Sequence, residues 1–462
     1  MGAALGRLWA VPPTIMWFRR DLRLADNPAL CAALAEAGGA DTYPVFVLDP
    51  ALLDPAGPAR KAFLRGCLDA LDDSLDGRLT IAAGDPADVI PKLARKVGAD
   101  AVIVTADFGP YGRRRDHAIA EALRADGRCL VPCDSPYAVE PGTVQSKSGE
   151  PYKVYSPFYR AWRAQGWPAP IAAPRLGTAA GPIGRKAVRP KDKPPAELPL
   201  PGEAAAEQRL AAFLRHADRY GDERDRPGID GTSRLSAYLK YGCIHPRQVL
   251  DRLGRSKGEE TFRREIAWRE FYADVLFHRP ESAYRSLQPA MAAFEVDEGA
   301  EADRRFAAWA EGRTGYPLVD AGMRQLVTEG WMHNRVRMIV ASFLVKDLHI
   351  DWRRGARHFM EFLVDGDLAN NQHGWQWVAG TGTDPAPFFR IYNPVRQGEQ
   401  FDPDGDYVRR FVPELAGVAG IAVHQPWNLD GGLPQGYPDR IVDHAAERQV
   451  ALARYVDTRG GH

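Results

Sequence analysis

From residue 14 to about residue 134, the chain alternates short apolar runs with amphipathic stretches. The runs are rich in β-branched residues, and the stretches between them repeat apolar residues at i, i+3 and i+4. Strands alternating with helices in this order are typical of a parallel sheet covered by helices. The expected strands are TIMWF (14–18), YPVFVLD (43–49), LTIAAG (79–84), AVIVTAD (101–107) and CLVPCD (129–134).

The pattern changes after residue 168. Residues 169–202 are rich in Pro, Ala and Gly without an apolar period, as expected of a connection between domains. We expect an α/β N-terminal domain with a parallel, Rossmann-like sheet over 12–140, a connection over 141–202 and an all-α C-terminal domain over 203–462. Helical apolar spacing predicts helices within 206–221, 233–242, 260–278, 316–330, 334–349 and 355–366.

Composition narrows the function classes. The 462 residues carry 60 Lys+Arg and 60 Asp+Glu, so any polyanion must be bound by a local basic patch rather than by overall charge. The five cysteines are scattered, which argues against a disulfide framework. Neither a dinucleotide-binding G-x-G-x-x-G after the first strand nor a P-loop motif occurs. No apolar run resembles a signal peptide or membrane span, so we expect a soluble, cytoplasmic protein with no membrane partner.

The segment GTSRLSAYLKYG (231–242) is a candidate anion site. Thr232 and Ser233 stand at an expected helix N-cap, with Arg234 just inside the helix. Free backbone N–H groups, two hydroxyls and a guanidinium would then converge on a site suited to a phosphate. An ordinary capped helix explains the same residues.

A predicted helix over 260–278 carries an aromatic face with a carboxylate. Glu265, Trp268 and Tyr272 lie at i, i+3 and i+7, and Arg269 and Glu270 are expected to the side. Such a face can stack a flat ligand and hydrogen-bond its edge. A core stripe of aromatic residues is the alternative interpretation.

The segment WMHNRVRMIVASF also places polar groups on an apolar face. Asn334, Arg337 and Met338 share one face of the expected helix, and Arg335 points elsewhere. An amide and a guanidinium beside Met are costly to bury without partners. This face therefore either binds a polar ligand or meets solvent.

The most unusual segment is VDGDLANNQHGWQWVAGTGTDPAPFFRIYNP, and 11 Trp in the whole chain exceed the needs of an ordinary core. The acids Asp365 and Asp367 lack a third acid at EF-hand spacing, so no metal site is expected. The density of amides, acids and indoles suits a planar heteroaromatic ligand. These side chains are Asp365, Asp367, Asn370, Asn371, Trp375 and Trp377.

At these segments the sequence resembles the photolyase/cryptochrome family, and it is most similar to its bacterial class I members that repair cyclobutane pyrimidine dimers. The resemblance rests on MWFRRDLRLADNPAL, WMHNRVRM, GDLANNQHGWQW and TGTDPAPFFRIYNP. It implies an N-terminal antenna domain and a helical domain that binds reduced FAD. By similarity the FAD-binding residues are Tyr220, Thr232, Ser233, Arg234, Leu235, Ser236, Phe262, Arg269, Asn334, Arg337, Asp365, Gly366, Asp367 and Asn371.

The resemblance also implies the substrate, a dimer flipped out of UV-damaged DNA and split by an electron from excited FAD. Glu265 and Asn334 would hydrogen-bond the dimer, Trp268 and Trp377 would pack against it, and Met338 would close the pocket. The expected DNA contacts are Arg224, Glu265, Trp268, Tyr272, Asn334, Arg335, Arg390 and Gln397.

Two features depart from the family pattern. Relatives carry electrons to oxidised flavin through three Trp residues; Trp375 and Trp352 match the inner two, whereas Val296 stands near the expected outer position. Photoreduction should therefore be slower or rerouted. Trp331 and Trp309 are expected in the core.

The antenna chromophore is the second open feature. ADFGPYGRRRD (106–116) and Lys240 resemble members that bind 8-hydroxy-5-deazaflavin more than those that bind methenyltetrahydrofolate, which makes Asp107 and Lys240 the antenna candidates. A solvated Lys and an Asp ending a strand are the ordinary interpretation.

Alternative functions remain within the same family. A cryptochrome-type blue-light receptor would bind FAD and signal through a protein, but Asn371, Met338 and the short C-terminus favour repair. Repair of the (6-4) photoproduct needs two His residues in the pocket, and only His333 is nearby. We expect a monomeric carbon–carbon lyase acting on damaged DNA.

Overall fold

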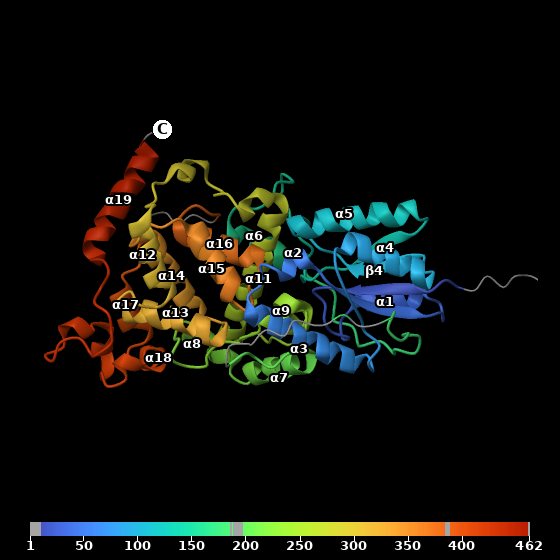
Figure 1. The fold of residues 1–462 in the computed structure, drawn as a ribbon, viewed down its shortest axis with the longest axis horizontal. Helices are drawn as coiled ribbons and strands as arrows, with labels where there is room; N and C mark the ends of the chain where they lie inside the picture. Colours follow the sequence, from blue (N-terminus) through green and yellow to red (C-terminus); the bar gives the residue numbers. More distant parts are fainter. Residues whose placement is uncertain (1–10, 185–186, 188–196, 384–388, 461–462) are drawn as a thin grey trace, which may run out of the picture.

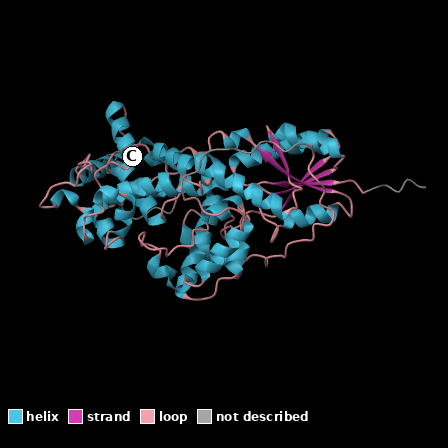
Figure 2. Ribbon diagram, turned by 60° about the horizontal axis from the view of Figure 1, so that its bottom comes forward, coloured by secondary structure: helices cyan, strands magenta, loops and turns pink. Residues whose placement is uncertain are grey.

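The computed structural model describes residues 11–184, 187, 197–383 and 389–460. An α/β region with its sheet at one end of the molecule continues into a larger helical region, and the last helix lies at the far end (Figure 1). Figure 2 shows the strands gathered together, with helices and the loops that join them making up the rest. The predicted fold class is confirmed. No helix in the described ranges is long and apolar enough to cross a membrane.

The sheet has five parallel strands in the order β3-β2-β1-β4-β5 within the described part of the chain. Each strand coincides with one of the five predicted runs. Their bounds are β1 (Thr14–Phe18), β2 (Thr42–Leu48), β3 (Thr80–Ala83), β4 (Ala101–Thr105) and β5 (Cys129–Cys133).

Helices cover both faces of this sheet, which is why β1 is buried at every position. Successive side chains of a strand point to opposite faces. Ile15 and Trp17 pack with α4 and α5, whereas Met16 and Phe18 pack with α1 and α3. The helices of the N-terminal region are α1 (Pro28–Glu36), α2 (Pro50–Leu53), α3 (Pro58–Ser74), α4 (Pro86–Val97), α5 (Pro110–Ala125) and α6 (Tyr155–Gln165).

The face of the sheet that carries Met16 and Phe18 shares one continuous apolar core with the helical region. The α-helices of that region are α7 (Glu203–Leu214), α8 (Tyr220–Glu223), α9 (Ser236–Tyr241), α10 (Pro246–Asp251), α11 (Lys257–His278), α12 (Ala300–Ala310), α13 (Pro317–Glu329), α14 (Asn334–Lys346), α15 (Trp352–Phe362), α16 (Leu368–Ala379), α17 (Pro394–Phe401), α18 (Asp406–Phe411) and α19 (His444–Gly460). Six 3-10 helices also occur in the described ranges: η1 (Ala217–Arg219), η2 (Pro280–Ala283), η3 (Pro289–Ala293), η4 (Pro413–Leu415), η5 (Gly420–His424) and η6 (Pro426–Asn428).

Part of the expected connection is core rather than surface. Helix α6 lies within 141–202, and its Trp162 is fully buried. Helix α6 packs on α11, and between the sheet and α6 the chain also runs against α11. The apolar face of α6 makes it a structural element of the helical region rather than a linker.

Two buried acids of helix α11 bind the segment between β5 and α6. Glu270, expected beside the aromatic face, is 2% exposed and accepts hydrogen bonds from the backbone N–H groups of Ala138 (2.5 Å) and Val139 (3.0 Å) and from Trp162 Nε1 (2.6 Å). Asp274, one turn further on, accepts from the backbone N–H of Gly142 at 2.7 Å. These bonds fix α11 relative to the segment that leaves the sheet.

We expect Glu270→Gln to lower the free energy of unfolding by about 2–4 kcal/mol, because the new amide NH₂ faces donors and leaves buried N–H groups unsatisfied. Urea unfolding followed by circular dichroism measures the change. The matched control is Glu311→Gln, which alters an exposed glutamate. Equal stability of the two variants would contradict the role given to Glu270.

Candidate functional site

A cavity of about 470 Å³ lies among α8, α9, α11, α14, α15 and α16. Every residue predicted to bind FAD or to act on the dimer lines this one cavity. The predicted lining residues are Tyr220, Thr232, Ser233, Arg234, Leu235, Ser236, Phe262, Glu265, Trp268, Arg269, Asn334, Arg337, Met338, Asp365, Gly366, Asp367, Asn371 and Trp377.

Helix α11 supplies the aromatic wall. Glu265, Trp268 and Tyr272 face the cavity, as their i, i+3 and i+7 spacing predicts. Behind Trp268 lies Tyr155 of α6, whose ring is nearly parallel to the indole (7°) with centroids 3.7 Å apart. Tyr155 also donates a hydrogen bond from its hydroxyl to the carbonyl of Arg264 at 2.7 Å. Helix α6, through Tyr155, therefore fixes the orientation of the Trp268 ring.

Glu265 is the carboxylate of this wall. It accepts a hydrogen bond from Arg224 Nη1 at 2.6 Å, and the side chains of both are about a quarter exposed. Burial raises the pKa of Glu265 above its ordinary value, although the Arg224 guanidinium opposes that shift.

Helix α14 contributes an amide, a guanidinium and a thioether. Asn334, Arg337 and Met338 line the cavity, and Arg335 points away from it, as predicted. Arg337 Nη2 is 2.8 Å from Asp365 Oδ2, so the two predicted ligand-binding groups pair with each other. The neighbouring His333 is 2% exposed and caps α14 by accepting from the Arg335 N–H.

The segment of acids, amides and indoles is largely helix α16. Asp367 caps this helix by accepting from the backbone N–H of Asn370 at 3.1 Å, and it also lines the cavity, so one side chain both caps the helix and faces the ligand site. Arg20, which follows β1, pairs with Asp367 at 2.7 Å. Although burial acts in the opposite direction, Arg20 and Lys240 hold the pKa of Asp367 well below its usual range. The N-terminal region therefore contributes to the electrostatics of the cavity.

The prediction of a helix N-cap at Thr232 and Ser233 is wrong. Helix α9 begins at Ser236 after an N-cap at Leu235 that has no side-chain hydrogen bond. Arg234 has a positive φ of 50°, a backbone conformation that interrupts any helix at that residue. The three residues 232–234 nevertheless line the cavity from a loop, so the anion-suited set remains without the helix terminus.

The tryptophans that line the cavity differ in part from those predicted to do so. Trp331, expected in the core, is half-buried and lines the cavity, where the Arg234 guanidinium lies 4.3 Å from its ring centroid. Trp375 lines the cavity and Trp352 does not. Trp309 is fully buried, as expected, and its ring centroid is 6.1 Å from that of Trp375. A side chain at Gly355 would overlap the Trp375 ring, so this Gly lets α15 and α16 approach closely.

The two antenna candidates lie in different surroundings. Asp107 follows β4, pairs with Arg115 at 3.2 Å and accepts from the Gly109 N–H at 3.1 Å. Lys240 instead lines the cavity, and burial together with Arg20 lowers the pKa of Lys240 to about 7. Lys240 thus belongs to the wall of the cavity lined by the FAD-binding candidates.

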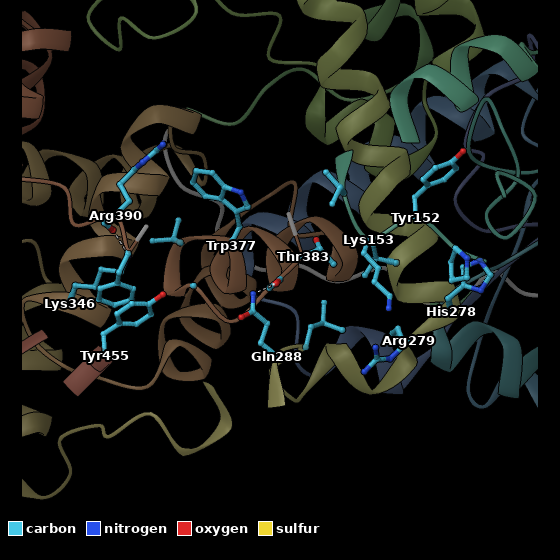
Figure 3. A pocket seen from close by; sticks show the side chains of 18 of the residues that line it. Tyr152, Lys153, His278, Arg279, Gln288, Lys346, Trp377, Thr383, Arg390 and Tyr455 are labelled. Carbon is cyan, nitrogen blue, oxygen red and sulfur yellow. Dashed lines mark hydrogen bonds between the residues drawn. The ribbon is translucent and has the colours of Figure 1, made fainter. Parts of the chain in front are cut away.

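A second cavity, of about 590 Å³, adjoins the first and shares Trp377 and Val378 with it. Figure 3 shows Arg390 and Lys346 at one end, Trp377 in between, and Lys153 and Arg279 at the other end. The expected DNA contact Arg390 is therefore here, whereas Gln397 on α17 lines neither cavity.

Several residues of the site gave no sequence signal of their own. Arg20 and Tyr155 reach it from segments far away in the chain, and Trp331 follows a Gly that ends α13. Asp365 and Asp367 pair with arginines, and the described residues contain no cluster of three metal-ligating side chains.

Comparison with known proteins identifies the family. A family model described as DNA photolyase matches residues 14–175, and one described as the FAD binding domain of DNA photolyase matches residues 262–457. The chain belongs to the DNA photolyase family. It is 43% identical to the deoxyribodipyrimidine photo-lyase of Streptomyces griseus, with 96% of this chain and 99% of that protein covered. The Agrobacterium fabrum deoxyribodipyrimidine photo-lyase is 42% identical over 96% and 97% of the two chains.

Solved structures of this family have the same fold. A bacterial class III photolyase from Agrobacterium tumefaciens has a TM-score of 0.89 at 39% identity and covers 99% of this photolyase-family chain. The match also covers 100% of the class III photolyase's own chain. The cryptochrome of Synechocystis sp. PCC6803 has a TM-score of 0.87 at 27% identity, over 96% and 99% of the two chains.

The cavity of this photolyase-family enzyme fits FAD. Asp365 Oδ1 and Trp375 Nε1 are buried in its wall without a hydrogen-bond partner among the described residues. Such atoms are costly to bury unless a ligand or water completes them. FAD presents hydroxyl, N–H and carbonyl groups to such atoms, and Thr232, Ser233 and Arg234 suit its phosphates.

We expect Asp365→Asn to weaken FAD binding about 10- to 100-fold, because a charge-assisted hydrogen bond and the partner of Arg337 are lost. The ratio of flavin to protein absorbance after purification, and titration of the stripped protein with FAD, measure the loss. Asp303→Asn is the matched control. It removes an exposed acid of α12 that pairs with Arg354 of α15. Full FAD content in Asp365→Asn would show that this carboxylate does not hold the cofactor.

Proposed function

We propose that this enzyme uses light to split cyclobutane pyrimidine dimers in DNA, with the damaged bases flipped into the cavity beside FAD. The observation that carries the proposal is that Glu265, Asn334, Trp268 and Trp377 line the same cavity as the FAD-suited residues. The names of the relatives, deoxyribodipyrimidine photo-lyases, support the same substrate. A flipped dimer is paired and stacked less firmly than intact bases, which favours its extrusion.

The FAD half of the cavity is the part with anion-suited and acidic groups. Thr232, Ser233 and Arg234 would hold the phosphates, and Asp365 and Asp367 would accept hydrogen bonds from the flavin and its ribityl chain. When bound and reduced, FAD supplies on excitation the electron that opens the cyclobutane ring.

The same half contains the residues that border the flavin ring. We propose that Arg337 and Asn371 lie beside it, since both line the cavity and Arg337 is already oriented by Asp365. Phe262 and Arg269 of α11 close that side. Tyr220, Leu235, Ser236 and Gly366 complete the FAD contacts.

The substrate half carries the groups that bind and polarise the dimer. Trp268 and Trp377 would pack against its rings, and Met338 would close the pocket. Asn334 and Glu265 would hydrogen-bond its polar edge. A protonated Glu265 can donate to a base carbonyl and so stabilise negative charge that develops on the dimer.

DNA would approach this neutral protein through local arginines and aromatic side chains. Arg224 and Tyr272 line the first cavity and Arg390 the second, and we propose that Arg335 and Gln397 also contact the strand. Basic side chains interleaved with aromatic rings are typical of surfaces that bind single-stranded or extruded nucleotides.

An antenna chromophore would add light absorption. We propose 8-hydroxy-5-deazaflavin as the antenna chromophore, with methenyltetrahydrofolate as the alternative. Asp107 and Lys240 are its candidate contacts, although Lys240 lines the FAD cavity. An archaeal photolyase from Sulfolobus tokodaii, 30% identical with a TM-score of 0.81 over 96% of this chain, is described as holding two FAD molecules, a third possibility. Fluorescence of the chromophore released on denaturation distinguishes them.

The experiment that tests the proposed function is illumination of the reduced protein with UV-damaged oligothymidine. Thymine absorbance should return only in the light. Its return should weaken as the pH rises through the raised pKa of Glu265, because the carboxylate cannot donate. Glu265→Gln should repair more slowly and without this pH dependence. No light-dependent recovery would instead support a cryptochrome-type receptor, since the Synechocystis cryptochrome has the same fold.

The electron route gives a second prediction. We expect Trp352→Phe to slow the photoreduction of oxidised FAD about tenfold or more, since Trp352 and Trp375 are the proposed donors. Trp309→Phe is the informative comparison, because the Trp309 ring centroid lies 6.1 Å from that of Trp375 and Trp309 is not one of the proposed donors. Loss of oxidised-flavin absorbance under blue light measures both. Slow photoreduction in Trp309→Phe with a normal rate in Trp352→Phe would place the route through Trp309.

A further inference from the structure

Four charged side chains form a chain of ion pairs, Glu265–Arg224–Asp225–Arg335, beside the substrate half of the cavity. Arg224 Nη1 is 2.6 Å from Glu265 Oε1, and Arg224 Nε is 3.8 Å from Asp225 Oδ1. Arg335 forms a bidentate ion pair with the same Asp225, from Nη2 to Oδ2 at 2.9 Å and from Nε to Oδ1 at 3.2 Å. Two cations and two anions make the network neutral.

The two guanidinium groups are close enough to share one anion, because both reach the carboxylate of Asp225. Guanidinium forks bind phosphate oxygens as they bind carboxylate oxygens, with two parallel N–H donors. The four side chains are 19–34% exposed, so solvent and a ligand can reach them. A backbone phosphate of DNA is therefore the anion that matches this site in charge and geometry once the carboxylates are displaced.

The charge of Glu265 depends on Arg224. Burial raises the pKa of Glu265, while Arg224 and, further away, Arg335 lower it and Asp225 raises it. The other titratable groups that face Glu265 are Tyr155 of α6 and Tyr220 of α8, both neutral because burial raises the pKa of each far above the neutral range. Arg224 is the cation in direct contact with Glu265, so the position of its guanidinium acts most directly on the charge of Glu265.

We propose that Asp225 and Glu265 hold, in the free protein, the two guanidinium groups that a DNA backbone phosphate takes over, and that this exchange makes Glu265 take up a proton. The inference rests on the proposed function. The phosphate binds Arg224 and Arg335, Asp225 stays a hydrated carboxylate, and the Glu265 carboxylate gains one proton from solvent. Glu265 thereby becomes a hydrogen-bond donor only when DNA is bound. Asp225 is a positioning residue, since it acts through the two arginines.

The test is calorimetric titration of the FAD-loaded protein with a short single-stranded oligothymidine carrying one cyclobutane dimer, repeated at pH values from about 5 to about 9. Repeating each titration in two buffers of different ionisation enthalpy gives the number of protons bound. We expect uptake approaching about one proton per complex, and affinity rising up to about tenfold per pH unit lowered within that window. Glu265→Gln should bind the oligonucleotide with no proton uptake at any pH.

Asp225→Asn separates the exchange from a purely structural role. It frees Arg335, so we expect tighter binding of damaged and undamaged strands and a salt dependence steeper by about 0.7 in slope. Proton uptake by Glu265 should persist. The matched control is Asp100→Asn, which removes the same charge from an exposed pair with Arg128 next to β4 and should change neither quantity.

The outcomes distinguish the inference from the proposed function. Damage-selective binding without proton uptake, or equal uptake in wild type and Glu265→Gln, overturns the inference and leaves the repair function standing. An unchanged salt slope in Asp225→Asn overturns the exchange at Arg335. Absence of damage-selective binding by the wild-type protein overturns the proposed function, and the inference with it.

Discussion

The geometry of the site depends on how α11 is held. Its 22 residues carry the aromatic wall of the cavity on one side and two buried acids on another. Glu270 and Asp274 accept backbone N–H groups from the segment that leaves the sheet, and Tyr155 stacks on Trp268 from the same connection. A helix without these contacts could rotate or slide and would no longer present Glu265 and Trp268 to one cavity. The connection between the two regions therefore serves as part of the site.

Charge pairing inside and beside the cavity follows one pattern, in which each of its three carboxylates, Glu265, Asp365 and Asp367, is paired with an arginine. Arg337 holds Asp365, and Arg20 holds Asp367. Arg224 holds Glu265 in the same way. Such pairing lowers the cost of burying charges before a ligand arrives, and it keeps the groups oriented. Binding would therefore rearrange these ion pairs and also complete the two buried atoms without a partner, Asp365 Oδ1 and Trp375 Nε1.

Local pattern was sufficient to predict much of the fold and the walls of the site. The five strands were predictable because both faces of the sheet are covered, which makes each strand a continuous apolar run between turns. The faces of α11 and α14 followed from helical spacing, so Glu265, Trp268, Asn334 and Met338 were placed together correctly.

The errors came where distant contacts or unusual backbone decide the outcome. The positive φ of Arg234 moved the start of α9 from Arg234 to Ser236, and no neighbouring residue type signals this shift. Glu270 looked like a flanking residue because its partners lie more than a hundred residues away in the chain. Trp331 looked like core because the loop containing Arg234, its cation partner, could not be placed from spacing.

The central claim is that one cavity holds FAD and the damaged bases together, with α11 as their shared wall. The most direct measurement is a crystal structure of the protein with FAD and an oligonucleotide that carries a dimer. We expect the dimer between Trp268 and Trp377, with a Glu265 oxygen within hydrogen-bond distance of a base carbonyl. A dimer bound outside the cavity, or FAD filling the space between these two indoles, would contradict the claim.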